Sequence, residues 1–414
     1  MAPARGTRDA TGATHATITI GLIAALAIQS AVPPFATDMY SPAFPRVTHD
    51  LATTSTSVGL TLTAFFVGIG LGQLVGGTGS DRWGRRAPMI LGGLTCTLGG
   101  VVCALTPGIG VLMAGRVLQG LGGGAAAVVG RAVLVDVARG DQLARIMSIL
   151  MALGALAPMI APVAGGVVLS VAGWRAVFWC LAGFGVLMMA MAALLIPETL
   201  PAQERQGGGL RRFAQGLREL AARRRFVGYM LTSAFSGFAM FAYVSASSFV
   251  LQQIKGLSPM EYSVFFACTA GSSMLMAILS SRLVGRVPPR RLIGAGLSLS
   301  AAGITVVTLS VLALDLALIP LCTGFVMTMA AQGFVFGNAS ALALSEARHI
   351  AGAASALLGL VQAAAMGASA PLASSGGGAS VVPMVMVMLV GITGAWCAFI
   401  LAGRGAVQRH LPEV

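Results

Sequence analysis

Long apolar segments alternate along the chain with short clusters of charged residues, proline and glycine. Twelve of these segments contain 20 residues or more, which is long enough for a helix to cross a bilayer. They cover residues 17–40, 54–77, 87–106, 109–136, 143–169, 174–196, 226–253, 260–281, 291–312, 315–340, 349–373 and 380–402. The pattern therefore predicts an all-α protein with twelve membrane-spanning helices.

The composition supports a membrane protein and excludes soluble classes. Only 9% of the 414 residues are charged and 56% are hydrophobic, whereas soluble domains carry about 25% charged residues. So little polar surface cannot cover a water-soluble globule of this size. A cytosolic enzyme and a disordered chain are both excluded.

One long interruption divides the predicted spans into two sets of six. It covers residues 197–225, and it separates a bundle at 17–196 from a second bundle at 226–402, with tails at 1–16 and 403–414. The segments Ser80–Arg86 and Ser281–Arg286 resemble each other at an offset of 201 residues. Duplicated six-helix halves are typical of transporters, whose substrate site lies between the halves near the midplane.

The net charge of +13 is a signal of orientation. With the N-terminus in the cytoplasm, 21 Lys and Arg residues fall on the cytoplasmic side and three on the other. Positively charged loops remain in the cytoplasm, so both termini are predicted to be cytoplasmic in the inner membrane of a bacterium. Because orientation in the membrane accounts for the positive charge, we do not expect nucleic acid as a partner. We expect the lipid bilayer as one.

No pattern for a cofactor or a metal is evident. The six cysteines lie inside apolar segments without a CxxC pair, and the four histidines have no ligand spacing. The run Gly120–Ala125 fits a dinucleotide fingerprint, but that fingerprint needs a preceding strand, so these glycines are predicted to pack helices. We expect no metal and no cofactor other than a proton as the coupling ion. We also expect that the protein is not an enzyme.

The most specific pattern lies between the second and third spans, in a segment that we expect to form a tight turn. It has the form Gly-x-x-x-Asp-Arg-x-Gly-Arg-Arg and contains Gly77, Asp81, Arg82, Gly84, Arg85 and Arg86. This pattern resembles the signature loop of the major facilitator superfamily. Arg131 and Asp136 close the fourth span, and we expect them to pair with this loop as a cytoplasmic gate.

Further motifs extend the resemblance over most of the chain. Residues 37–42, 243–247, 256–259 and 351–356 with Gln362 are similar to the branch of bicyclomycin- and chloramphenicol-resistance exporters (Bcr/CflA). The fifth span resembles the proline–glycine antiporter motif of the superfamily, and the resemblance implies a seal against proton leak. The motif residues are Gly154, Pro158, Pro162, Gly165 and Gly166.

Asp38 and Arg116 are charged residues inside predicted spans, where each charge costs about 2.5–3.5 kcal/mol on insertion scales. Counting from the span ends places them at similar depth. Burial favours the neutral form of a carboxyl group and a nearby guanidinium favours its ionised form, so such a carboxyl can exchange protons near neutral pH. The alternatives are a structural salt bridge and a carboxyl wetted at the interface. Some family exporters carry a second acid in the first span, where this chain has Ser30.

Aromatic and amide side chains at midspan are the candidates for substrate contact. They are Tyr40, Gln119, Phe238, Phe241, Tyr243, Gln332, Phe336, Asn338 and Gln362. Each also suits ordinary packing within a bundle. The 21 methionines suit an adaptable apolar surface that accepts several ligands.

The resemblance implies a drug/proton antiporter with the major facilitator fold. We expect a monomer that exports small amphipathic antibiotics, chloramphenicol- or bicyclomycin-like, by alternating access. A proton-coupled exporter or uptake symporter of a small metabolite, such as an amino acid or a sugar, shares the same architecture. A membrane-embedded enzyme would need a metal cluster or a nucleophile–base pair within the spans, and the sequence shows neither. A non-transporting membrane sensor is a further alternative, and the absence of any soluble domain weighs against it.

Overall fold

The structure is a computed structural model that describes residues 19–138, 140–205, 219–347 and 351–403. The predicted N-terminal tail at 1–16, residues 404–414 of the predicted C-terminal tail at 403–414, and residues 206–218 of the predicted linker lie outside the described residues. All twelve predicted spans correspond to helices in the described part of the chain. Twelve helices there are long and apolar enough to cross a membrane. The prediction of an all-α membrane protein is confirmed.

The first half of the chain folds into the helices α1 to α7, with a short 3₁₀ turn η1 and a short helix α2 after α1. Their bounds are α1 Ile20–Asp38, η1 Ser41–Ala43, α2 Phe44–Asp50, α3 Ser55–Trp83, α4 Arg86–Ala104, α5 Ile109–Val137, α6 Gly140–Ala172 and α7 Trp174–Leu195.

The second half supplies α9 to α14, and the 3₁₀ turn η2 Ala202–Glu204 precedes it. The bounds are α9 Arg224–Phe249, the π-helical turn η3 Val250–Ile254, α10 Pro259–Leu283, α11 Pro289–Ala313, α12 Leu318–Ser345, α13 Ala351–Ser374 and α14 Val382–Gly403.

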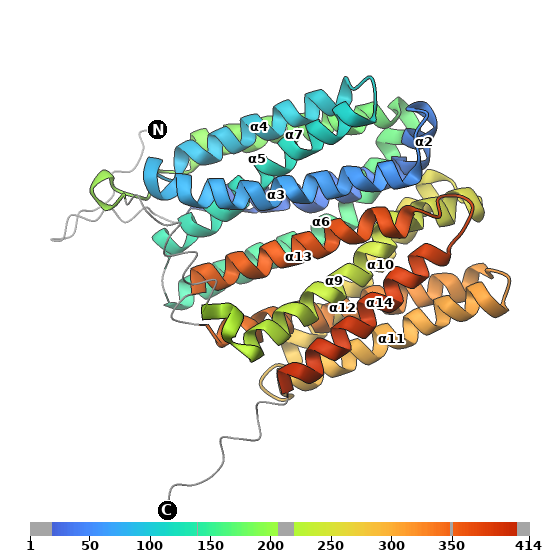
Figure 1. The fold of residues 1–414 in the computed structure, drawn as a ribbon. Helices are drawn as coiled ribbons and strands as arrows, with labels where there is room; N and C mark the ends of the chain where they lie inside the picture. Colours follow the sequence, from blue (N-terminus) through green and yellow to red (C-terminus); the bar gives the residue numbers. More distant parts are fainter. Residues whose placement is uncertain (1–18, 139, 206–218, 348–350, 404–414) are drawn as a thin grey trace, which may run out of the picture.

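The helices form two bundles, which lie one above the other in Figure 1. Within the first bundle α5 packs against α3 and α4, and α4 against α7; within the second, α11 packs against α12 and α9 against α14. The bundles meet where α3 contacts α13 and where α6 contacts α10. We call these contacts, together with those of η1 against α9 and α10, the seam.

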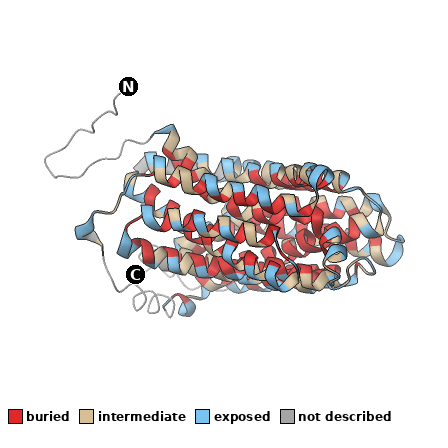
Figure 2. Ribbon diagram, turned by 90° about the horizontal axis from the view of Figure 1, so that it is seen from above, coloured by how far each residue is buried: buried red, intermediate tan, exposed pale blue. Residues whose placement is uncertain are grey.

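Burial follows the arrangement expected in a bilayer. Buried residues gather along the helix faces that point into the molecule, and exposed residues cover the outer faces and the ends (Figure 2). Large apolar side chains, among them Val67, Leu98 and Leu275, are exposed on the outside. Such surface is compatible with lipid because the helices satisfy their backbone hydrogen bonds internally. The chain is a multi-pass membrane protein.

Glycine allows close contact between α3 and α5. A methyl group at Gly120 would lie 2.1 Å from the carbonyl oxygen of Phe65, and one at Gly72 would lie 2.1 Å from that of Leu121. On the adjoining face of α5, a methyl at Gly122 would lie 2.3 Å from the carbonyl oxygen of Gly92 in α4. The prediction that the glycine run of α5 packs helices is confirmed.

Several predicted boundaries differ from the helix ends, and two of these differences have a clear physical cause. Residues 77–83 continue α3, and the chain turns only at Gly84 and Arg85, because the loss of hydrophobicity marks the edge of the membrane and not the end of the helix. Gly77 is also open, since a methyl group added there would have no atom within 4 Å, so it permits no close approach. The tenth span begins at Leu318 and not at residue 315, because Asp315 and Leu316 have positive φ angles.

The bundles are bonded to each other near one end of the molecule, which we call the Asp50 end. There, Thr63 donates a hydrogen bond to the carbonyl oxygen of Gly367 at 2.6 Å, and Gln252 donates one to that of Pro42 at 3.1 Å. At the opposite end, which carries Arg85, the hydrogen bonds and ion pairs between described residues each stay on one side of the seam. The described structure is closed at the Asp50 end.

The α3–α5 contact gives a test of the fold. Replacing Gly120 with Ala should lower stability by about 1–3 kcal/mol, because the added methyl overlaps a backbone carbonyl that cannot move aside. Thermal unfolding of the purified protein in detergent measures the change. Gly183→Ala in α7 is the matched control, since no atom lies within 4 Å of its added carbon. Equal melting temperatures for the two variants would contradict the packing.

Candidate functional site

Asp38 is the last residue of α1 and is 7% exposed. Its Oδ1 lies 2.8 Å from the hydroxyl of Thr37, which also lies 2.9 Å from the carbonyl oxygen of Pro33. Because Thr37 has one hydroxyl proton, it can donate to one of these acceptors at a time. An ionised Asp38 can accept that proton, and a protonated Asp38 can donate to Thr37 while Thr37 donates to Pro33. The site therefore has a bonded arrangement for either charge state.

Arg116 is fully buried in α5 and has no carboxylate partner among the described residues. Its guanidinium carbon lies 4.4 Å from the ring centroid of Phe65, 5.2 Å from that of Tyr40 and 5.9 Å from that of Phe178. Its Nη1 donates to Oε1 of Gln119 at 2.6 Å. Aromatic rings attract a desolvated cation through their negative faces, so the three rings take the place of a counter-ion.

The structure does not pair Asp38 with Arg116. The guanidinium lies over the ring of Tyr40, two residues beyond Asp38, and the carboxyl bonds to Thr37. The salt-bridge alternative is therefore absent from this conformation. Two nitrogens of Arg116, Nε and Nη2, have no hydrogen-bond partner, and neither has Nε2 of Gln119.

The antiporter motif lies on α6, which is continuous through Pro158 and Pro162. A methyl group at Gly165 would lie 2.1 Å from the carbonyl oxygen of Met39, and one at Gly166 would lie 2.5 Å from the hydroxyl oxygen of Ser263 in α10. These two glycines bring α6 against the end of α1 and against the other bundle. Gly154 makes no such contact, since no atom lies within 4 Å of its added carbon.

At the Arg85 end the signature residues form an ion cluster. Arg85 Nη1 lies 2.7 Å from Oδ1 of Asp81, and Arg85 Nε lies 2.9 Å from Oδ2 of Asp136. Arg86 donates to the carbonyl oxygen of Ala193. Arg131 is exposed and Arg82 lies in the last turn of α3, and neither joins the cluster through a bond between described residues. Of the predicted pairing, the contact of Asp136 with the signature residues exists through Arg85, which bridges Asp136 and Asp81. This contact lies within one bundle and does not cross the seam.

Glu198 completes this cluster, although no motif in the sequence indicates it. Its carboxylate accepts the backbone N–H groups of Arg85 at 2.8 Å, Leu200 at 3.1 Å and Arg86 at 3.3 Å. Partial burial raises the pKa of Glu198, but these N–H donors and the nearby Arg205 outweigh it and hold the pKa below its ordinary value. A side chain at Gly84 would meet this carboxylate, and its φ of +89° also favours glycine.

The candidate substrate residues are spread over several helices. Tyr243 is fully buried, its hydroxyl lies 3.0 Å from that of Thr269, and its ring packs on Phe266 and Phe325, so it belongs to the core of its bundle. Phe241 meets Phe66 across the seam with ring centroids 4.8 Å apart.

The three candidate amides of the second bundle each make a separate contact. Gln332 accepts from Ser236 at 2.8 Å, Gln362 donates to Ser233, and Asn338 donates to Ser280 at 2.7 Å. Phe238 and Phe336 are half-buried.

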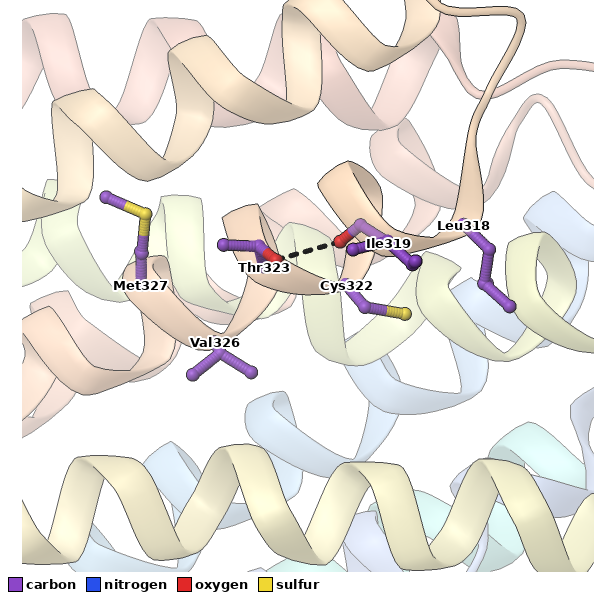
Figure 3. A pocket seen from close by; sticks show the side chains of 6 residues that line it. All are labelled: Leu318, Ile319, Cys322, Thr323, Val326 and Met327. Atoms are coloured by element: carbon purple, nitrogen blue, oxygen red, sulfur yellow. Dashed lines mark hydrogen bonds between the residues drawn. The ribbon is translucent and has the colours of Figure 1, made fainter.

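A pocket of about 440 Å³ is lined by none of these residues (Figure 3). One helix, α12, lines it with apolar side chains and with Thr323, whose hydroxyl donates to the carbonyl oxygen of Ile319 at 2.8 Å. Ile319 is among the most exposed apolar residues of the molecule. The pocket is therefore a depression in the membrane-facing surface, and none of the candidate site residues lines it.

Twelve spans in two bundles, with ionisable residues buried beside the seam, define a membrane transporter. The chain belongs to the Major Facilitator Superfamily, whose family profile matches residues 26–371. This confirms the resemblance of the motifs.

Curated relatives place the chain near drug-resistance proteins. It is 35% identical to "Uncharacterized MFS-type transporter YdgK" of Bacillus subtilis, covering 79% of this chain and 82% of the relative. It is 32% identical to "Bicyclomycin resistance protein homolog" of Haemophilus influenzae (82% and 85%) and 29% identical to "Multidrug resistance protein MdtL" of Escherichia coli (80% and 82%). The resemblance to the bicyclomycin-resistance branch is confirmed.

A solved structure supports the fold. A bacterial homologue of the human lysosomal transporter Spinster superposes with a TM-score of 0.71 at 18% identity, covering 92% of this chain and 96% of that one. This likeness concerns the fold alone.

The rings of Phe65, Tyr40 and Phe178 form an aromatic cage around Arg116. The cage predicts that the stability of the protein depends less on the charge of this side chain than on its shape. Arg116→Met should unfold at a temperature equal to or above that of wild type, because a buried charge without an ionic partner carries a desolvation cost. Arg116→Lys should unfold at a lower temperature, because its ammonium is more strongly hydrated and cannot stack as a plane. Thermal unfolding in detergent makes the comparison, and a lysine variant more stable than the methionine variant would contradict the cage.

Proposed function

We propose that the protein is a proton-driven exporter of small amphipathic antibiotics, chloramphenicol- or bicyclomycin-like, that works by alternating access. The observation that carries the proposal is Asp38, a buried carboxyl at the end of α1 with a hydroxyl partner able to bond either charge state. The names of two relatives, a bicyclomycin resistance protein homologue and a multidrug resistance protein, support drugs as the substrate class.

The coupling depends on where Asp38 lies. Opening the Asp50 end separates η1 from α9 and α10 and exposes the segment that follows Asp38 to water. Protons then reach Asp38 from the outside and substrate leaves. After the bundles rock and the Asp50 end closes, substrate entry from the other side favours release of the proton. The proton is the only coupling ion in this proposal.

Orientation follows from the arginine-rich end. We place that end, with both termini, in the cytoplasm of a bacterial inner membrane, since positively charged loops stay inside. The described structure is then closed to the outside. We further propose that the protein acts as a monomer, because each chain contains both bundles and its own seam.

The second bundle favours an uncharged substrate or one with little charge. Helices α9, α12 and α13 carry no acidic residue within their bounds, and their buried polar groups are amides and hydroxyls. Gln332 bonds Ser236 and leaves its own Nε2 without a partner. Such a surface supplies hydrogen bonds without a counter-charge, so it does not suit multiply charged cations.

Asp38→Asn is the direct test. The variant should fold, because asparagine can keep a hydrogen bond with Thr37. It should lose chloramphenicol and bicyclomycin resistance in an efflux-deficient host, and it should lose drug transport driven by a pH gradient in vesicles. Asp315→Asn, at an exposed acid in the α11–α12 loop, is the matched control and should transport as wild type does.

Undiminished gradient-driven export by the Asp38 variant would refute proton coupling at this residue. The sign of the pH change that drug addition causes in vesicles distinguishes antiport from symport. A proton-coupled uptake symporter, or an exporter of a sugar or an amino acid, would show the opposite sign or no response to these drugs.

A further inference from the structure

Three hydroxyl groups and a carbonyl form a continuous chain across the seam at the Asp50 end. The hydroxyl oxygen of Ser41 lies 2.7 Å from that of Tyr262 and 3.3 Å from the carbonyl oxygen of Val244. The Tyr262 hydroxyl lies 3.1 Å from that of Ser247. Ser41 belongs to η1 in the first bundle, and the other groups belong to α9 and α10 in the second. All three hydroxyl-bearing residues are 0% exposed.

The carbonyl gives this chain a direction. A carbonyl oxygen can only accept, so Ser41 donates its single proton to Val244. Tyr262 then donates to Ser41, and Ser247 donates to Tyr262. Every hydroxyl proton is used once, and the Tyr262 and Ser41 oxygens each donate and accept. Tyr262 is the central member, because it is bonded to both serines.

The surrounding contacts exclude water from the hydroxyl chain. Phe44 and Phe249 meet across the seam with ring centroids 6.0 Å apart. Gly166 lets α10 approach α6 one residue after Tyr262, at Ser263. A buried hydrogen bond of this kind is costly to leave unmade, so the bundles part at this end only if water reaches all of these groups.

The hydroxyl chain is next to the proposed proton site. Asp38 is the last residue of α1 and Ser41 is the first residue of η1, three residues further along the backbone. A change in the hydroxyl chain therefore changes the surroundings of Asp38, and the reverse also holds. Neither Ser41 nor Tyr262 was among the candidate residues from the sequence.

We propose that Tyr262 is a positioning residue for transport, the centre of a hydroxyl latch (Ser41, Tyr262 and Ser247) that holds the Asp50 end closed and keeps the end of α1 against α10. The latch releases when this end opens and re-forms when it closes. The inference rests on the alternating access of the proposed function, but it requires neither a drug nor a proton gradient.

Distances between spin labels on the full-length protein in detergent test the latch. The labels are attached at His49→Cys and Ala313→Cys, both exposed at the Asp50 end on different bundles, after the six native cysteines are replaced by alanine. The unmutated latch should give mainly the short distance. Tyr262→Phe should raise the ratio of long to short distances about two- to tenfold, because the one hydrogen bond that Tyr262 makes across the seam, to Ser41, is lost.

Ser41→Ala should shift the same distribution in the same direction, and it carries the test if the Tyr262 variant does not fold. Thr269→Val is the matched control. It removes an equally buried hydroxyl bond to a tyrosine, Tyr243, inside one bundle, and it should leave the distribution unchanged.

An unchanged distribution in both latch variants would overturn the proposal, and so would an equal shift in Thr269→Val. Because the measurement uses no substrate, these outcomes leave the proton-coupled export open to its own test. Conversely, failure of the Asp38→Asn prediction would leave the distance result standing.

Discussion

The structure depends on a conflict between two requirements of a membrane transporter. In a bilayer every buried polar group must find its partner inside the protein, yet the two bundles must be able to part. The chain reconciles these requirements by confining the hydrogen bonds between bundles to a few positions near the Asp50 end, such as Ser41–Tyr262 and Gln252–Pro42. Elsewhere the described part of the seam is mainly apolar side chains and small residues, with Gln73 of α3 beside Gly359 of α13 as a polar exception.

Within each bundle, by contrast, the helices are held by close backbone contacts and by buried polar groups with partners in the same bundle. These contacts make the bundle rigid. Gly120 and Gly72 bring α3 and α5 into backbone contact, and Arg116 fixes Phe65, Tyr40 and Phe178 around one cation. This difference in bonding predicts that the bundles move as units and that the seam is the element that changes. Asp38 lies where the two kinds of packing meet, because the end of α1 contacts Gly165 of α6 within its bundle and leads into Ser41 at the seam.

The sequence predicts local features well and contacts between bundles poorly. The twelve spans follow from hydrophobic length, and the glycine packing of α5 follows from its position in midspan. The continuation of α3 to Trp83 was missed because hydropathy reports the membrane and not the helix. Glu198 and Tyr262 look ordinary in the sequence, since their significance comes from which helix ends meet in space. Thr37 belongs to the 37–42 motif, but the motif does not show that its hydroxyl bonds to Asp38. Asp38 and Arg116 are predicted to lie near each other only from their similar depth in the membrane. Depth does not show that the Arg116 side chain points at aromatic rings.

We propose that substrate and proton compete through Asp38 in a protein whose described structure is closed at the Asp50 end. The most direct measurement is proton release on addition of chloramphenicol to the purified, detergent-solubilised protein in weakly buffered solution. Competition at Asp38 predicts that drug addition acidifies the solution, that this release is absent from Asp38→Asn, and that it disappears at high pH, where Asp38 is already ionised. Drug binding without any release of protons, or release that persists in the variant, would contradict it.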